Sequence, residues 1–382
     1  MTSSSLNPVD VFVVGGGPAG LATAIAARRC GLSVIVADGA VPPIDKSCGE
    51  GLMPDGVEAL RALGITIPEN DSYPFSGIRF VSDGTTAEAA FPRGTAYGIR
   101  RTHLHRAMQQ HAEACGVQML WQTAVTGLHE EGALVAGELV RASWVVGADG
   151  TGSRVRKWAS LEPRDHLANN RNSNHKQNLR FAFRRHYRVL PWTSFMELHW
   201  GNHCQIYVTP VSREEVCVAL VSSSPKFRLD DALAEFPELS IRLKNTAYSS
   251  TERGAITITR RLRRVYRGKT VLVGDASGGV DAITGEGLCL TFRQAALLGD
   301  CLASADLRRY QNEHRNLSRR PALMARMMLS MAKHGALRRR TMRVFQSSPR
   351  SFAGMLAMHL GEGSPRDHIS NGLTLGWDFL TA

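Results

Sequence analysis

The sequence lacks the features that mark several classes of protein. It has seven cysteines, an odd count, and no two of them stand in a Cys-x-x-Cys pair, which argues against a disulfide framework or a zinc ribbon. No stretch reaches the ~20 apolar residues that a membrane-spanning helix needs. The first ten residues show no positive region followed by an apolar core, so we expect a reducing, cytoplasmic setting.

Internal repeats, low-complexity tracts and recognised nucleic-acid-binding modules are absent too. What remains is an ordinary globular composition, with 43% hydrophobic and 21% charged residues among 382. A chain of this length can bury a large core and predicts about two domains, or one large α/β unit with an insertion.

The charge is unevenly distributed. The net charge is +12, and the surplus cations gather at 180–188, 260–267 and 319–343. Such clusters are typical either of a solvated face or of contact with an anionic partner. Because no nucleic-acid module accompanies them, we expect no nucleic acid partner. Peripheral contact with a membrane or an acidic protein stays open.

Periodicity predicts alternating strands and helices. A helix is expected over 102–116, stopped by Gly116, and consecutive strands over 117–150. Strand patterns recur at 205–211 and 214–223, and the chain is expected to be helical from about 289. The polar stretch 167–178 predicts a loop or lid.

A glycine turn stands near the start of the chain. In "VVGGGPAGLATAIAARRCGLSVIVAD", a strand precedes Gly15, Gly17 and Gly20, a helix follows them, and Asp38 ends the next strand. The glycines permit a tight turn and close backbone approach, the helix dipole faces a pyrophosphate, and the carboxylate accepts from ribose hydroxyls. The pattern predicts a site for the ADP part of a dinucleotide.

Two further glycine-rich segments follow apolar strands. The first, "VVGADGTGSRVRKWA", holds Asp149, Gly150 and Arg156, and it equally fits a helix capped by Ser153 or Asp149. The second, "GDASGGVDAITGEGL", runs from 274 to 288 and leads into helical apolar spacing. Backbone N–H groups at such a strand-to-helix junction can meet a phosphate or another polar group of a large ligand.

The three segments together, in this order, resemble the FAD-dependent monooxygenases of the aromatic hydroxylase type, a superfamily shared with geranylgeranyl reductases and flavin-dependent halogenases. The resemblance implies an α/β fold: a Rossmann-like FAD-binding domain, an inserted and mainly antiparallel β-sheet substrate domain, and a helical C-terminal segment. The FAD-binding domain is expected to comprise 1–75, 99–160 and 266–305. The substrate domain is expected at 76–98 and 161–265, and the helical segment at 306–382.

The resemblance also implies which residues contact FAD. They are Gly15, Gly17, Pro18, Ala19, Gly20, Asp38, Arg101, Val125, Asp149, Gly150, Asp275, Gly285, Gly287 and Leu288. Arg100 is the alternative to Arg101. Asp275 is implied to approach the ribityl chain or the pyrophosphate, and the backbone of 285–288 to meet the isoalloxazine ring.

The sequence departs from the family pattern at several places. Asp38 stands where glutamate is commoner, and Ala282 replaces a proline, which predicts a less rigid backbone over the flavin. The Trp-x-Trp motif of tryptophan-type halogenases is missing from "WGNHCQIYVTPV", which argues against halogenation. The "CGEG" within 46–64 is nearest the geranylgeranyl-reductase branch.

The activity implied is hydroxylation of an aromatic or other electron-rich substrate, either a small molecule or a peptidyl side chain, in a biosynthetic or peptide-modifying pathway. It would use O2 and a flavin C4a-hydroperoxide, with NAD(P)H as a transient reductant or with a separate flavin-reducing partner. Three alternatives stand beside it: a reductase of carbon–carbon double bonds, a halogenase, and an FAD-binding accessory protein acting through a protein partner.

Catalytic residues are not identified by any motif. The sequence favours structural hydrogen bonding over direct catalysis for each of the substrate-side candidates, which are Lys46, Cys48, Glu50, His186, Tyr207 and Glu286. His199 and His203 are four residues apart, but their segment predicts a turn into a strand rather than a helix, so we expect no metal site there.

Overall fold

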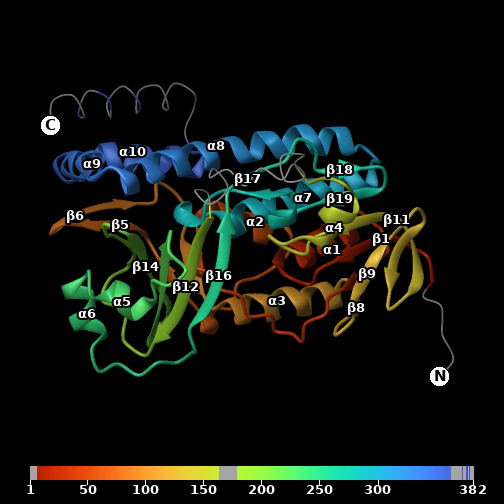
Figure 1. Cartoon of the computed structure of the whole chain (residues 1–382), viewed down its shortest axis with the longest axis horizontal. Coiled ribbons are helices and arrows are strands. Elements are labelled where there is room, and N and C mark those ends of the chain that lie inside the picture. The colour runs from red at the N-terminus through yellow and green to blue at the C-terminus, as the bar shows by residue number, and fades with distance from the viewer. Residues whose placement is uncertain (1–6, 163–178, 363–371, 373–375, 377, 379–382) are drawn as a thin grey trace.

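The computed structural model describes residues 7–162 and 179–362, together with 372, 376 and 378. The stretch 167–178, expected to be a loop, lies outside the described residues. Two sheets dominate the described chain and lie side by side, with long C-terminal helices running along one side of both (Figure 1).

The first sheet is parallel at its centre and has the order β18-β19-β11-β1-β2-β8. The apolar runs of its central strands are buried on both faces, as parallel strands covered by helices should be. Its strands are β1 (Val9–Val14), β2 (Val34–Ala37), β8 (Gln118–Leu120), β11 (Glu138–Gly147), β18 (Tyr266–Arg267) and β19 (Thr270–Leu272), with β9 (Val125–His129) and β10 (Gly132–Val135) attached to β11.

Helices pack around this sheet. Helix α1 (Pro18–Arg29) is buried on nearly every side, which explains its small apolar residues. It contacts α3 (Arg101–Ala114) and α7 (Gly287–Ala303). Gly116, at φ +79°, follows the expected helix and lets the chain leave in a left-handed conformation. The helices are α1 (Pro18–Arg29), α2 (Pro54–Ala62), α3 (Arg101–Ala114), α4 (Arg154–Trp158) and α7 (Gly287–Ala303).

The second sheet has the order β16-β12-β15-β14-β13-β5-β6 and is antiparallel except where β13 meets β5. Its central strands are buried on both faces: Ala219 and Val221 face one apolar cluster, and Val218 and Leu220 face another. Its strands are β5 (Gly77–Ser82), β6 (Thr85–Ala90), β12 (Leu179–Tyr187), β13 (Phe195–Trp200), β14 (Cys204–Ser212), β15 (Glu215–Ser222) and β16 (Arg253–Ile258).

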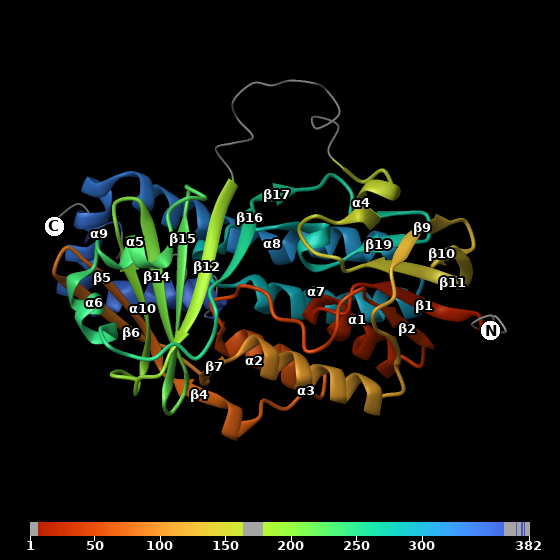
Figure 2. The same ribbon diagram turned by 60° about the horizontal axis from the view of Figure 1, so that its bottom comes forward.

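The C-terminal helices α8 (Leu307–Lys333), α9 (Gly335–Ser347) and α10 (Pro349–Leu360) cover one face of this sheet, and α5 (Leu229–Leu233) and α6 (Pro237–Leu243) cover the other. Figure 2 shows both layers at the same end of the molecule. Along α8, Met324 and Met328 are buried while Arg319 and Arg326 are exposed. The basic C-terminal segment therefore has a core-facing side and a solvent-facing side.

Short elements complete the described chain. They are β3 (Gly51–Leu52), β4 (Ser72–Phe75), β7 (Ala96–Ile99), β17 (Arg260–Arg261) and β20 (Gly278–Gly279), with the 3₁₀ turns η1 (Glu69–Asp71), η4 (Gly274–Ser277) and η5 (Ala282–Thr284). None of the described helices is long and apolar enough to cross a membrane. The expected fold class is confirmed: a Rossmann-like domain with an inserted, mainly antiparallel sheet and a helical C-terminal segment.

Candidate functional site

A cavity of about 590 Å³ lies between the two sheets. Its first wall consists of the chain segments that leave the carboxyl ends of β1, β2, β11 and β19, where ligands bind in open α/β sheets. Its second wall consists of side chains from β12 to β16. The three glycine-rich segments of the sequence therefore meet at one place.

The first glycine turn forms a close-fitting cradle. Gly15 has φ +109°, and a Cβ at Gly20 would lie 1.8 Å from the Gly15 carbonyl oxygen. Only glycine fits such an approach. Asp38 Oδ2 accepts a hydrogen bond from the Gly16 N–H at 2.7 Å, so the carboxylate is fixed beside the turn. These features fit the ADP part of FAD, with the pyrophosphate at the start of α1.

The second segment supports the structure as well as the cavity. Asp149 Oδ2 accepts from the N–H groups of Arg154 at 2.7 Å and Val155 at 3.1 Å, so it caps α4 while lining the cavity. Ser153 Oγ accepts from the N–H of Arg156. The capping alternative is thus confirmed.

Arg156 ties the second segment to the third. Its guanidinium is buried and donates to the carbonyl oxygens of Ala276 at 2.9 Å and Thr151 at 2.8 Å. In the third segment Asp275 accepts from Thr151 Oγ1 at 3.2 Å and pairs with Lys46 at 3.4 Å. Both side chains of this ion pair are about half exposed, so the pair remains available to a charged ligand.

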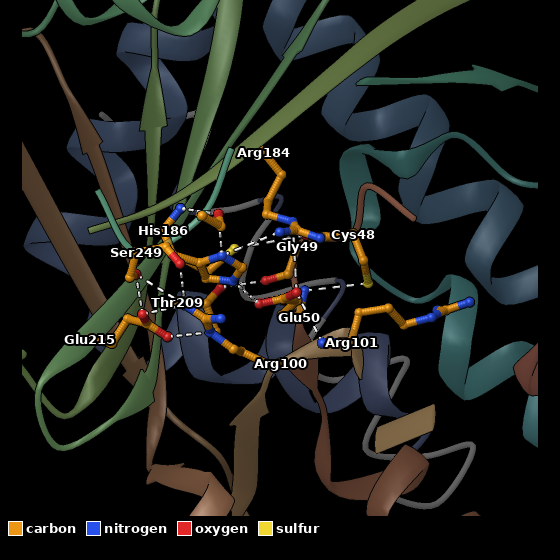
Figure 3. A network of polar contacts seen from close by, with 12 residues as sticks. Cys48, Gly49, Glu50, Arg100, Arg101, Arg184, His186, Thr209, Glu215 and Ser249 are labelled. Atoms are coloured by element: carbon orange, nitrogen blue, oxygen red, sulfur yellow. Dashed lines mark hydrogen bonds and ion pairs between the residues drawn. The ribbon is translucent and has the colours of Figure 1, made fainter. Parts of the chain in front are cut away.

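Arg101, rather than its neighbour, faces the cavity. Arg101 lines it and has a buried Nε without a hydrogen-bond partner in the described part of the chain. The guanidinium of Arg100 is instead engaged by Glu215 and Ser249 (Figure 3). A buried donor aimed at the cavity fits an anionic or polar group of FAD.

The wall from the second sheet is mainly apolar. The hydroxyl of Tyr207 donates to the Ile283 carbonyl at 2.6 Å, and burial raises the pKa of this phenol. The hydroxyl is therefore neutral and already bonded. The residues that this wall contributes to the cavity are Ala182, Met196, Tyr207, Ala219, Val221, Ala255, Ile256, Thr257 and Ile258.

A buried polar network stands behind the loop that contains Cys48 and Glu50 (Figure 3). Glu50 is 2% exposed; its Oε2 lies 2.6 Å from His186 Nε2, and its Oε1 accepts from the Arg101 N–H at 3.0 Å. The Nε of Arg184 lies 3.7 Å from Glu50 Oε1. This carboxylate therefore joins the loop to β12 and to the start of α3.

The same network contains a group of potential metal ligands. Atoms of Glu50, His186 and Cys217 lie within 4.8 Å of one another. Burial, and then the neighbouring Glu50 carboxylate, raise the pKa of the Cys217 thiol well above its usual range. The Arg184 guanidinium already balances Glu50. A protonated thiol and an adjacent cation make this a poor cation site.

Glu286 does not line the cavity, although Gly285 and Gly287 on either side of it do. Its side chain is buried near Asp55 and lies 3.7 Å from His359 Nδ1. Burial, and then the charge of Asp55, raise the pKa of Glu286 to about 8. Burial, and then Arg320, lower the pKa of His359 to about 4. At neutral pH both groups are therefore mainly uncharged.

The residues expected to contact FAD all line the cavity except Gly20, which lies beneath the turn and shapes it. Among the substrate-side candidates Lys46, Cys48, Glu50 and Tyr207 line it, whereas His186 and Glu286 lie outside it. Their roles stay predictions. Apart from Tyr207, the residues of the second wall were not predicted, although strand alternation places several of them on one face.

Comparison with known proteins places these observations in a family. The model of the FAD binding domain family matches residues 8–309. A menaquinone reductase from Mycobacterium tuberculosis is 28% identical over 324 residues, covering 78% of each chain. A 6-methylpretetramide 4-monooxygenase from Streptomyces rimosus is 33% identical over 171 residues, covering 40% of this chain and 41% of its own.

Among solved structures, the flavin-dependent brominase Bmp2 superposes with a TM-score of 0.77 at 19% identity, covering 97% of this chain and 99% of its own. At that identity the likeness concerns the fold alone. The family match spans most of the chain and all three glycine-rich segments. The chain therefore belongs to the FAD binding domain family, within the FAD-dependent monooxygenase superfamily, and is an FAD-dependent oxidoreductase.

Proposed function

We propose that this chain is a flavin-dependent reductase that saturates a carbon–carbon double bond in an apolar, prenyl-type substrate. Reduced FAD, when bound, would supply a hydride to one carbon of the double bond, and a proton from water would complete the saturation at the other. The observation that carries the proposal is the apolar second wall of the cavity, where Ala182, Met196, Ala219 and Val221 offer no polar group and the Tyr207 hydroxyl is already bonded. Such a wall suits a hydrocarbon chain.

Among the described residues of this wall, Tyr207 and Thr257 alone carry polar side chains, and the charged groups Glu50 and Lys46 beside it have partners within the protein. Hydroxylation of a phenol calls for a base within hydrogen-bond reach of the substrate. Glu50 is bonded to His186 and to the Arg101 N–H, and Lys46 is paired with Asp275. Among the described residues that line the second wall, none presents a free carboxylate or imidazole. This supports a substrate from which no proton is removed.

The comparisons lend further support. The menaquinone reductase aligns over 78% of this chain, whereas the monooxygenase aligns over 40%. Menaquinone is a naphthoquinone with an unsaturated prenyl chain, so it combines an apolar body with reducible double bonds. The "CGEG" of 48–51, which resembles the geranylgeranyl-reductase branch, lies in the loop that lines the cavity.

The test is anaerobic turnover. FAD-loaded protein is reduced by NADPH, NADH or dithionite and incubated with a prenylated quinone, a geranylgeranyl lipid and a saturated analogue as control. The expected product gains two hydrogen atoms in its chain, as measured by mass spectrometry, and the saturated analogue is unchanged. Formation of product only in the presence of O2, with a gain of one oxygen atom, would contradict the proposal.

A second candidate is hydroxylation of an aromatic compound with NAD(P)H and O2. It is favoured by the 33% identity with the 6-methylpretetramide 4-monooxygenase, which exceeds the identity with the menaquinone reductase over a shorter span. Turnover under ¹⁸O₂ with a panel of polycyclic phenols tests it. Incorporation of ¹⁸O supports hydroxylation, and consumption of NAD(P)H without labelled product argues against it.

A further inference from the structure

A basic segment of the chain runs past the mouth of the cavity. From Arg253 to the residue before Asp275 the sequence has seven cations and no carboxylate: Arg253, Arg260, Arg261, Arg263, Arg264, Arg267 and Lys269. All of these except Arg260 are exposed. We call this set the basic rim.

The basic rim borders the cavity directly. Residues 255–258 of β16 and Arg260 line the cavity, and β16 is an edge strand of the second sheet. Ile256 lines the cavity and is nevertheless 51% exposed, which places an apolar side chain at the mouth. β17 pairs with β20, whose Gly279 also lines the cavity. One cation of the basic rim, Arg260, and an exposed isoleucine therefore lie at the opening.

The same basic surface continues onto the start of α8. Arg315 donates from Nη2 to the Arg263 carbonyl at 2.7 Å, which joins this helix to the basic rim. Arg308, Arg309 and Arg319 are also exposed on α8, where Glu313 is an exposed carboxylate. β17 lies on one side of the molecule and α3 on the opposite side in both views (Figures 1 and 2).

Most of the basic rim is unneutralised. Within residues 7–162 and 179–362, ion pairs link Arg253 to Asp45, but Arg261, Arg263 and Arg264 have no carboxylate partner. A cluster of like charges repels itself and is stabilised by an anionic surface. Each such cation near an anionic bilayer contributes about 1 kcal/mol of attraction.

We infer that the basic rim docks on an anionic lipid bilayer, with Ile256 at the contact. This inference rests on the proposed function in one respect: an apolar chain could pass from the bilayer into the cavity without crossing water. Exposed apolar side chains flanked by cations are what interfacial binding to anionic lipid requires. A purely polar partner, such as an acidic protein, would not use the apolar mouth.

The test is co-sedimentation of FAD-loaded protein with vesicles, without substrate. The protein is expected to bind vesicles of phosphatidylcholine mixed with phosphatidylglycerol and not to bind vesicles of phosphatidylcholine alone. It should dissociate from the mixed vesicles as the salt concentration rises. The triple variant R261Q/R263Q/R264Q should lose roughly a hundredfold in affinity, since three charges at about 1 kcal/mol each are removed. The matched control R61Q/R93Q/R106Q removes three exposed cations elsewhere and should bind as the parent does.

A second pair of variants tests the apolar contact. Ile256→Ser should weaken binding a few-fold, whereas Ile241→Ser, at a position 72% exposed on α6, should not. Bound flavin absorbance and circular dichroism establish that each variant is folded. The inference is overturned if the parent protein ignores anionic vesicles at low salt, if both triple variants lose binding equally, or if polyglutamate binds it while vesicles do not. Because no turnover is measured, failure of the proposed reductase activity leaves this result intact.

Discussion

Glu50 Oε2 lies 2.6 Å from His186 Nε2. Both side chains are almost fully buried, and their contact joins the loop beside the cavity to the second sheet. Glu50 has φ +60°, a conformation that glycine adopts more easily, and it stands between two glycines. A non-glycine residue keeps such a conformation when its surroundings hold it there. We therefore infer that a glutamate occupies this position because its carboxylate is bonded to His186 and to the Arg101 N–H.

Glu50→Gly should lower the free energy of unfolding, even though glycine adopts the left-handed backbone conformation at this position more easily. The variant leaves His186 without its carboxylate partner and Arg184 with Asp45 alone, and breaking a buried pair in this way costs roughly 3–5 kcal/mol of unfolding free energy. FAD affinity should also fall, because the Arg101 N–H loses its acceptor. Urea unfolding and flavin titration measure both effects.

The control is Asn245→Gly at an exposed position with φ +64°. It relieves the same backbone conformation without removing a buried carboxylate, so its unfolding free energy should be unchanged or rise by up to about 1 kcal/mol. If Glu50→Gly behaves like this control, the side chain of Glu50 does not hold the loop.

Glu286 should make stability fall as the pH rises. Its pKa is raised to about 8, above the usual value of 4.5, so the folded protein holds a proton that the unfolded chain releases between these values. Stability from this group is full below pH 4.5 and is lost as the pH approaches 8. Glu286→Gln removes this dependence, so the variant should gain stability relative to the parent between pH 5 and pH 8.

Urea unfolding at several pH values measures the difference between parent and Glu286→Gln. Glu58→Gln, at an exposed position on α2, is the control and should leave the pH profile unchanged. His359 contributes in the opposite direction, because its pKa is lowered to about 4 and stability from it rises with pH up to about its usual 6.5. A constant difference between parent and Glu286→Gln would show that Glu286 is ionised in the fold.

Two glycines of the first turn should respond differently to alanine. Gly20→Ala places a methyl group 1.8 Å from the Gly15 carbonyl oxygen, so it should lower both the stability of the apo-protein, by about 1–3 kcal/mol, and the affinity for FAD. At Gly17 an added Cβ meets no atom within 4 Å, but the position lines the cavity. Gly17→Ala should therefore weaken FAD binding alone. Equal loss of apo-protein stability in both variants would refute this difference.

The sequence made the first wall of the cavity predictable because each of its parts follows a strand within one continuous segment. Gly15, Asp38, Asp149 and Asp275 all end or follow apolar strands, and parallel strands bring such ends together. The sequence also predicted correctly that a turn leads into a strand near Cys204, where β14 begins.

The buried network could not be predicted in the same way. Glu50, Arg184 and Cys217 are far apart in the chain and meet only through the register of β12 and β15, where His186 pairs with Cys217. Cations at 180–188 looked like surface charge, yet Arg184 is 1% exposed. Arg184 is buried because Asp45 and Glu50, in the loop before β3, pair with it. The residue pattern within β12 gives no indication of these two carboxylates.

Substitution of Tyr207 tests whether its hydroxyl takes part in the reaction or only forms part of the second wall. Its hydroxyl donates to the Ile283 carbonyl, so Tyr207→Phe should lose one buried hydrogen bond, about 1 kcal/mol of unfolding free energy, and change turnover little. Tyr310→Phe is a matched control, since this buried hydroxyl donates to the Leu272 carbonyl outside the cavity. Both variants should be destabilised by similar amounts. If Tyr207→Phe retains FAD and the stability of the control but loses turnover a thousandfold, Tyr207 delivers a proton to the substrate and is not merely part of the wall.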